Sequence, residues 1–315
     1  MSDTEQRRVD AIVVGGGIAG LTAATVLAEH GYAVTMIDEY CGGGRLLTMG
    51  VVKAYPALEP SIDGPDLAAR CLDAALDAGV EAFPARVVGL EFDGMWLART
   101  TDGTLRAPAV VLATGRTMDV ATVPGAAEFV GRGLSHCASC DGPLFAGQSV
   151  AVVGTSWWLA TEVGELAAVT DRVNVLLPAQ GPPGPQGAWA QVAGLANVHV
   201  VTGARLVGVE GGSQGIATVV VERDGESEHV AARGLFLCDD VMPSVPEGLP
   251  ADLLDETGAI QTVDGAATAM AGLFAAGDVR AGSVPYLVSA AADGVRAALA
   301  ASAFLAASAA ASTNG

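Results

Sequence analysis

Residues 11–39 read AIVVGGGIAGLTAATVLAEHGYAVTMIDE, and their pattern decides the fold. Ala11–Val14 is a short apolar run that indicates a buried strand, and Leu21–His30 has the composition of a helix closed by a glycine. Ala33–Ile37 is a second apolar run of strand length. The stretch therefore predicts a strand, a glycine turn, a helix and a parallel strand, which is the start of an open α/β sheet.

The glycines between the first strand and the helix are spaced for a ligand. Gly15, Gly17 and Gly20 have the G-x-G-x-x-G spacing, which lets backbone N–H groups approach a pyrophosphate at the start of a helix. Asp38 and Glu39 follow the second strand, where an acid can bind ribose hydroxyl groups. We predict a dinucleotide site, against the alternative of a glycine-rich turn without a ligand. Its candidate residues are Gly15, Gly17, Ile18, Ala19, Gly20, Asp38 and Glu39.

A second unit of the same kind begins near residue 149. Ser149–Gly154 reads as a strand entering a turn, Leu159–Ala168 as a helix and Val173–Leu177 as the next strand. Later in the chain, Gly272–Asp278 is a strand that runs into an acid, and Tyr286–Leu305 is a long helix. The chain therefore holds one nucleotide-type unit, a second one inserted, and a return to the first.

This order predicts an α/β fold with two Rossmann-like nucleotide-binding domains, the second inserted into the first. The first domain is expected to be discontinuous, over residues 1–117 and 240–315, and the inserted domain to cover residues 118–239. A chain of 315 residues has the length for two domains of ordinary size.

Composition and charge exclude several classes of partner. Sixteen basic and 35 acidic residues give a net charge of −19, so a nucleic-acid partner is excluded and an anionic membrane surface is disfavoured. The polar start MSDTEQRRVD carries no apolar signal segment. The longest charge-free apolar stretch, Ala297–Ala311, is too short to span a bilayer. We expect a soluble cytoplasmic protein.

Cys137 and Cys140 form a Cys-x-x-Cys motif that is followed directly by Asp141. Two cysteines at this spacing at a helix start can close a reversible disulfide, and helix N–H groups lower the pKa of a thiolate. Asp141 could move protons during exchange, and His136 could stabilise a Cys137 thiolate or serve only at the surface. A pair of buried structural cysteines is the alternative. The other three cysteines are isolated and no histidine pair has ligand spacing, so no metal site is expected.

The run Gly131–Gly142, GRGLSHCASCDG, resembles the redox segment of the low-molecular-weight thioredoxin reductases. The resemblance covers nearly the whole chain, because several further motifs occur in the order of that family. They are Gly15–Gly20, Gly43–Leu46, Tyr55-Pro56, Gly64–Leu67, Ala113–Gly115, Val123–Gly125 and Gly272–Asp278.

The resemblance implies FAD bound by the first domain, an inserted domain of the NADPH type that carries the dithiol, and a homodimer. It implies that Cys140 faces the flavin, that Cys137 exchanges with substrate and that Asp141 is the acid and base. Asp278 would hold the ribityl or pyrophosphate end of FAD. The candidate FAD contacts that this resemblance adds are Gly44, Arg45, Leu46, Ala113, Thr114, Gly115, Gly277, Asp278, Tyr286 and Leu287.

The inserted domain departs from the family pattern where NADPH should bind. Its turn, residues 154–160, reads GTSWWLA, so Ser156 replaces the second glycine and two tryptophans occupy the helix start. The family has a basic cluster for the 2′-phosphate after the next strand, whereas residues 173–204 contain no Lys or Arg. Each lost charge-assisted contact removes about 1.5–3 kcal/mol. We expect NADPH binding to be weak or lost, unless Arg172 or Arg205 supplies the charge.

Two further segments depart from the family. Pro285-Tyr286-Leu287 stands where an Arg-Gln-Ala sequence usually opens the last helix, near the flavin. Pro143–Ala146 replaces the aromatic and basic residues that help to dock thioredoxin. Both segments adjoin the expected redox centre, so they bear on the choice of substrate.

These observations predict an FAD-dependent dithiol/disulfide oxidoreductase. The favoured hypothesis is an oxidase that converts a small-molecule dithiol to an intramolecular disulfide with O2 as acceptor, as in the branch of the family that serves natural product biosynthesis. The alternative is a thioredoxin reductase-like disulfide reductase that uses NADPH weakly or another donor such as ferredoxin. A third hypothesis is a non-catalytic flavin redox sensor. The three differ in whether a dithiol alone consumes O2, whether a donor is needed, or whether no turnover occurs.

Overall fold

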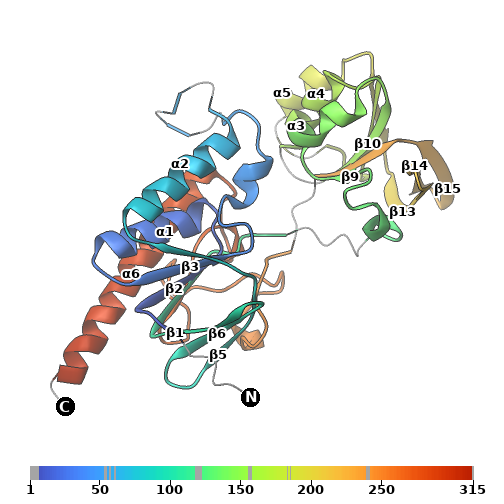
Figure 1. The fold of residues 1–315 in the computed structure, drawn as a ribbon. Coiled ribbons are helices and arrows are strands. Elements are labelled where there is room, and N and C mark those ends of the chain that lie inside the picture. The colour runs from blue at the N-terminus through green and yellow to red at the C-terminus, as the bar shows by residue number, and fades with distance from the viewer. Residues whose placement is uncertain are drawn as a thin grey trace. The chain divides into compact units, whose positions relative to one another are not determined.

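The structure is a computed structural model that describes residues 7–52, 55–56, 58–59, 62–117, 123–154, 158–182, 184, 186–238 and 242–313. The chain divides into two compact units (Figure 1). Unit 1 comprises Met1–Thr117 and Met242–Gly315, and unit 2 comprises Met118–Val241.

Unit 1 is built on a five-stranded parallel sheet in the order β17-β8-β2-β3-β4. Its strands are β2 (Ala11–Val14), β3 (Val34–Asp38), β4 (Glu81–Pro84), β8 (Ala109–Leu112) and β17 (Leu273–Ala275). A second sheet has the order β1-β7-β6-β5, with β1 (Arg7–Arg8), β5 (Val87–Phe92), β6 (Trp96–Thr100) and β7 (Gly103–Ala107). The helices are α1 (Ile18–Glu29), α2 (Gly64–Asp77) and α6 (Leu287–Thr313), with short 3-10 segments at Gly44–Thr48, Ala251–Leu253 and Gly277–Val279.

The two faces of the parallel sheet carry two separate cores. Ala11 and Val13 of β2 pack with α1, α2 and α6, whereas Ile12 and Val14 pack with the second sheet, including the buried Trp96. Successive side chains of a strand point to opposite faces, so a continuous apolar run is what a sheet covered on both sides requires. The result is a helix layer, a parallel sheet and a second sheet (Figure 1).

Unit 2 repeats this design. Its parallel sheet has the order β12-β11-β10-β16-β9, formed by β9 (Leu134–Ser135), β10 (Ser149–Val153), β11 (Arg172–Leu177), β12 (Val198–Thr202) and β16 (Gly234–Leu237). One face packs with α3 (Ala138–Asp141), α4 (Leu159–Ala167) and α5 (Gln186–Val192). The other face packs with the antiparallel sheet of β13 (Arg205–Gly212), β14 (Gly215–Arg223) and β15 (Glu226–Ala231). Two 3-10 segments cover Ala126–Phe129 and Gly142–Phe145.

α6 corrects the expectation that no segment has the length and composition of a membrane span. Over Leu287–Ala311 this helix has a mean hydropathy of 1.5, so it is long and apolar enough to cross a membrane. However, α6 packs along α1 in the core of unit 1. It also carries Asp293, which is 4% exposed and forms ion pairs with Arg280 and Arg296. Its hydropathy comes mainly from alanine, and 28% of its most apolar window is buried.

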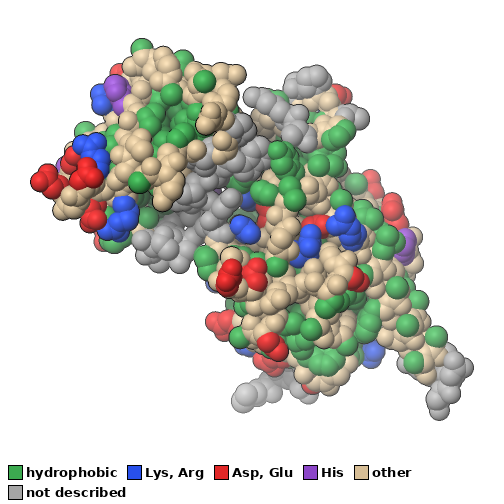
Figure 2. Space-filling view, turned by 180° about the vertical axis from the view of Figure 1, so that it is seen from behind, with side chains coloured by type: hydrophobic (Ala, Val, Ile, Leu, Met, Phe, Trp, Pro, Cys, Tyr) green, Lys and Arg blue, Asp and Glu red, His purple; other side chains and the backbone are tan. Residues whose placement is uncertain are grey.

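Charged side chains are mixed on the surface. On the face shown in Figure 2, the described Lys and Arg side chains lie among Asp and Glu and form no continuous basic surface. Several arginines pair with acids, as in Arg205–Glu222 and Arg223–Glu228. This distribution agrees with the net charge of −19 in offering no electrostatic footprint for a nucleic acid on that face.

Candidate active site

The redox motif is a closed disulfide at the start of a single helical turn in unit 2. Cys137 and Cys140 are bonded, with their Cα atoms 5.4 Å apart. Cys137 caps α3, and its Sγ accepts the N–H of Cys140 at 3.1 Å. α3 ends at Asp141 because Gly142 and Pro143 change the chain to a 3-10 turn. The expected helix is therefore only one turn long, and a local N–H group rather than a long helix dipole is available to the sulfur.

Asp141 and a serine lie on one side of the disulfide. The Ser135 hydroxyl donates to Asp141 Oδ2 at 2.7 Å, and the Cys137 N–H donates to Ser135 Oγ at 3.1 Å. Ser135 is 3% exposed, so this link is sheltered from water. Two hydrogen bonds through Ser135 therefore link the predicted acid, Asp141, to the backbone of Cys137. Ser135 was not among the residues predicted from sequence, although it is a polar residue on the buried strand β9, two positions before the first cysteine.

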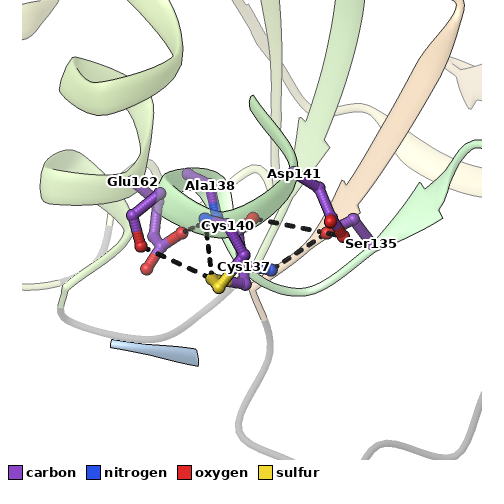
Figure 3. The surroundings of a disulfide bond; sticks show 7 residues. Ser135, Cys137, Ala138, Cys140, Asp141 and Glu162 are labelled. Carbon is purple, nitrogen blue, oxygen red and sulfur yellow. Dashed lines mark hydrogen bonds between the residues drawn. A yellow bond between two sulfur atoms is a disulfide. The ribbon is translucent and has the colours of Figure 1, made fainter. Parts of the chain in front are cut away.

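A second carboxylate approaches the disulfide from α4. The Ala138 N–H donates to Glu162 Oε2 at 2.8 Å, across 24 positions of sequence. Figure 3 shows the Glu162 side chain and the Ser135–Asp141 pair on opposite sides of the cysteines. The sequence analysis missed Glu162, because only the packing of α3 against α4 brings it to the motif.

The two cysteines differ in exposure. Cys137 is 3% exposed and packs in the core, whereas Cys140 and the predicted His136 are exposed. In this oxidised arrangement Cys140 is therefore the more accessible of the two. The remaining cysteines are separate from this centre: Cys41 and Cys71 are half-buried and Cys238 is buried. Burial raises the pKa of the Cys71 thiol. Among the described residues, no group of three His, Cys, Asp or Glu side chains could hold a metal.

The glycine turn of unit 1 has the shape of a dinucleotide site. Gly15 has φ +99°, and a Cβ at Gly20 would lie 1.8 Å from the Gly15 carbonyl oxygen, so both positions require glycine. A Cβ at Gly17 would meet nothing within 4 Å, which leaves open space beside the N-terminus of the 12-residue helix α1. Ile18 and Ala19, which begin α1, are buried.

The other predicted unit 1 residues gather at the carboxyl ends of the parallel strands. Asp38 ends β3, and its carboxylate accepts the N–H groups of Gly16 at 2.7 Å and Gly42 at 2.9 Å. Because Gly43 N–H also donates to the Gly16 carbonyl at 2.7 Å, Asp38 joins the glycine turn to the next loop. A carboxylate can accept further bonds, so this role is compatible with ribose binding. Glu39 is exposed.

An ion pair between Arg45 and Asp278 connects the 3-10 segments Gly44–Thr48 and Gly277–Val279. Arg45 Nη1 lies 3.6 Å from Asp278 Oδ2, and the Arg116 Nε donates to the Asp278 carbonyl at 3.0 Å. The Thr114 hydroxyl donates to the Ser244 carbonyl beside them. The remaining predicted positions differ in exposure. Leu46, Ala113 and Gly277 are buried, whereas Tyr286 is 36% exposed. Gly44 begins a 3-10 segment, Gly115 follows β8 with φ +63°, and Leu287 begins α6.

Comparison with known proteins places these features in a family. Residues 9–295 match the family model of pyridine nucleotide-disulphide oxidoreductases. The chain is 32% identical over 301 residues to the thioredoxin reductase of Treponema pallidum, which covers 94% of this chain and 97% of that one. It is 30% identical over 295 residues to the thioredoxin reductase of Listeria innocua, with 92% of each chain covered. The crystal structure of Lactococcus lactis thioredoxin reductase superposes with a TM-score of 0.87 at 26% identity, over 95% of this chain and 99% of that one.

The chain belongs to the pyridine nucleotide-disulphide oxidoreductases. Within this family it is a thioredoxin reductase-like flavin-dependent thiol-disulfide oxidoreductase, and its cofactor is FAD. The residues of unit 1 fit that group: the open space at Gly17 suits a pyrophosphate, and Asp38, Arg45 and Asp278 supply polar groups at the same sheet edge.

The structure places both arginines that the sequence offered as partners for the 2′-phosphate of NADPH in unit 2. Thr155, Ser156 and Trp157 lie outside the described residues, and Trp158 is the N-cap residue of α4. Arg172 begins β11 at the end opposite the carboxyl edge and donates to Asn174. Arg205 lies at that edge instead, because the N–H of its neighbour Ala204 donates to the Leu177 carbonyl at 3.0 Å. Arg205 is therefore the candidate cation for a 2′-phosphate, and it is paired with Glu222 at 3.1 Å.

Proposed function

We propose that this flavoprotein is a disulfide reductase that transfers electrons through the Cys137–Cys140 disulfide to a protein disulfide of the thioredoxin type. The observation that carries the proposal is the disulfide itself, held between Asp141 and Glu162. It occurs in a chain similar over more than nine-tenths of its length to thioredoxin reductases. FAD, when bound, supplies two-electron exchange with this disulfide. The sequence alone favoured the oxidase, whereas these relatives favour the reductase.

The residues have separate roles in this reaction. Cys140, the exposed cysteine, faces the flavin, and two-electron reduction with uptake of one proton gives one thiol and one thiolate. The Cys137 thiolate then attacks the substrate disulfide, forms a mixed disulfide and releases a substrate thiolate, which Asp141 protonates. Cys140 attacks the mixed disulfide, restores the Cys137–Cys140 bond and releases the second substrate thiol. Because Cys137 is buried in the oxidised form, reduction must increase its access to substrate.

The proposed electron donor is a nicotinamide dinucleotide used with little preference between NADPH and NADH. The described part of unit 2 brings Arg205 to the edge where a 2′-phosphate would lie, and residues 173–204 contain no Lys or Arg. An exposed cation that is already paired with Glu222 contributes about 0.2–1 kcal/mol, which is less than tenfold in affinity. We further propose that the enzyme is a cytoplasmic homodimer, as the family resemblance implies.

A dithiol oxidase with O2 as acceptor is the second candidate. One observation favours it, namely the tryptophan cap of α4 together with the absence of cations from residues 173–204. In that case a small-molecule dithiol would reduce the Cys137–Cys140 disulfide, and the electrons would leave through the flavin to O2, giving H2O2.

Anaerobic turnover tests the proposal. The FAD-loaded protein is mixed with oxidised thioredoxin and either NADPH or NADH, and the thiols released are counted with Ellman's reagent. The proposal predicts two thiols for each coenzyme oxidised, with both coenzymes active. The oxidase would replace the reductase if neither NADPH nor NADH supported thiol release and if, in a separate aerobic sample, dithiothreitol alone caused the protein to consume O2.

A further inference from the structure

Two carboxylates lie beside the disulfide, and only one of them follows it in sequence. Asp141 is bound by the Ser135 hydroxyl on one side. Glu162 accepts the Ala138 N–H at 2.8 Å on the other side (Figure 3). Glu162 belongs to α4, the first helix after the second glycine turn, and its partner amide lies directly after Cys137.

We propose that Glu162 is a positioning residue of the redox centre, which orients the turn at Cys137 and Ala138 and whose negative charge disfavours the Cys137 thiolate. The proposal rests on the proposed function in one respect, because it assigns Glu162 to the same dithiol that reduces the substrate.

The packing around Glu162 holds its carboxylate in place. Leu159, Ala160 and Val163 of α4 are buried in one core with Ala138, which is itself 2% exposed. α3 and α4 therefore meet through well-packed apolar side chains on either side of Glu162. A carboxylate fixed in this way accepts a backbone N–H without the entropy loss of an unrestrained surface side chain. This arrangement is what distinguishes a positioning role from a chance surface contact.

The charge of Glu162 acts on a sheltered sulfur. Cys137 is 3% exposed, so water screens its surroundings poorly, and a like charge nearby disfavours ionisation of a thiol. Glu162 also occupies the Ala138 N–H, which leaves the Cys140 N–H as the amide that bonds the Cys137 sulfur. The charge of Glu162 therefore lowers the fraction of Cys137 that is ionised, whereas the Cys140 N–H favours the Cys137 thiolate that attacks the substrate.

Other titratable groups lie on the described elements that form this centre. Asp141 lies on α3, the exposed His136 precedes Cys137, and Glu165 lies one turn further along α4. The 3-10 segment Gly142–Phe145 carries no titratable group. The variants described next change Glu162 and leave Asp141 intact. A shift in the ionisation of Cys137 in these variants can therefore be assigned to Glu162.

The test is the pH dependence of Cys137 alkylation in a Cys140→Ser background. The protein is reduced chemically, treated with iodoacetamide from pH 5 to pH 10, and the Cys137 peptide is quantified by mass spectrometry. Glu162→Gln keeps an oxygen for the Ala138 N–H and removes the charge, so we expect the alkylation midpoint to fall by about one pH unit. Glu162→Asp keeps the charge and should leave the midpoint near that of the parent. Glu226→Gln, an exposed charge on β15 of the same unit, is the matched control and should leave it unchanged.

A Glu162→Gln profile that coincides with the parent profile would overturn the proposal. If this variant fails to fold, Glu162→Ala, which lacks the charge, is compared with Glu162→Asp, which keeps it, and a lower midpoint in Glu162→Ala alone is the expected result. Because the thiols are reduced chemically, the readout does not depend on the flavin. Failure of the proposed function would instead show as absent turnover with NADPH and NADH in the unaltered protein.

Discussion

The two glycine turns of this molecule each follow a parallel strand and lead towards a helix, and each requires glycine for packing. In unit 1, β2 leads into α1 through Gly15–Gly20, and the position of Gly17 faces open space. In unit 2, β10 leads through Gly154 towards α4, and a Cβ at Gly154 would lie 2.4 Å from the Cys238 carbonyl oxygen. Both turns need glycine for packing, and the first also faces open space at Gly17.

The helices that follow the two turns are used differently. α1 has no acid in its first turn, so its N-terminus suits an anionic pyrophosphate. α4 carries Glu162 in its first turn, and this carboxylate binds the amide next to Cys137. The helix after the glycine turn therefore suits the cofactor in unit 1, whereas in unit 2 it contacts the redox disulfide segment.

The largest effect is expected at Cys140. Cys140→Ser removes the disulfide and the sulfur that exchanges electrons with the flavin, so turnover should fall by about 10³-fold or more. FAD should remain bound, because unit 1 is unchanged, and its absorbance reports this directly. Cys71→Ser, which alters a half-buried cysteine of unit 1, is the control. Turnover near the original rate in Cys140→Ser would remove the disulfide from the mechanism.

Asp141→Asn should slow turnover by about 10²–10⁴-fold, the range for loss of a general acid or base. The variant keeps an oxygen for the Ser135 hydroxyl, so the local structure should persist. The measurement is the pH profile of turnover, with Asp171→Asn, an exposed acid of unit 2, as control. An unchanged rate and pH profile would show that Asp141 does not move protons.

Gly17→Ala tests whether the open space in unit 1 belongs to the cofactor. The added methyl group meets no protein atom, so the free protein should keep its thermal stability. It would intrude on the pyrophosphate, and overpacking of about 1–3 kcal/mol corresponds to roughly 5- to 150-fold weaker FAD binding. Gly187→Ala on α5 also meets open space and should leave FAD affinity unchanged. Equal FAD affinity in the two variants would place the pyrophosphate elsewhere.

The smallest effect is expected at Arg205. Arg205→Ala should lower kcat/KM for NADPH by roughly two- to fivefold, because an exposed ion pair contributes about 0.2–1 kcal/mol. The value for NADH should not change, since NADH has no 2′-phosphate. Arg223→Ala removes a cation that is likewise paired with a glutamate and serves as the control. A larger loss, above about tenfold with NADPH alone, would mean that unit 2 recognises the phosphate strongly after all.

The sequence predicted what depends on local pattern. The apolar run at Ala11–Val14 coincides with β2 because a strand buried on both faces leaves no polar position. α1 begins at Ile18 rather than Leu21, because Gly20 lies inside the first helical turn and not in the loop. The Cys-x-x-Cys spacing indicated a reversible disulfide between Cys137 and Cys140, and the structure contains it.

What the sequence could not predict depends on contacts between distant segments. Glu162 reaches Ala138 only because α3 packs on α4, and no local pattern marks that pairing. The absence of cations from residues 173–204 favoured the oxidase, but the hydrogen bond from Ala204 to Leu177 brings Arg205 to the same edge. The membrane expectation considered Ala297–Ala311 alone, whereas the helix is one continuous element from Leu287.

An anaerobic titration of the flavin absorbance tests the central claim most directly. The FAD-loaded protein is titrated in separate samples with NADPH, NADH and dithiothreitol. The account predicts that both coenzymes bleach the flavin, with two equivalents needed for the unaltered protein and one for Cys140→Ser, because the disulfide takes up the other electron pair. Bleaching by dithiothreitol alone, with the colour restored by air, would contradict the account and identify a dithiol oxidase.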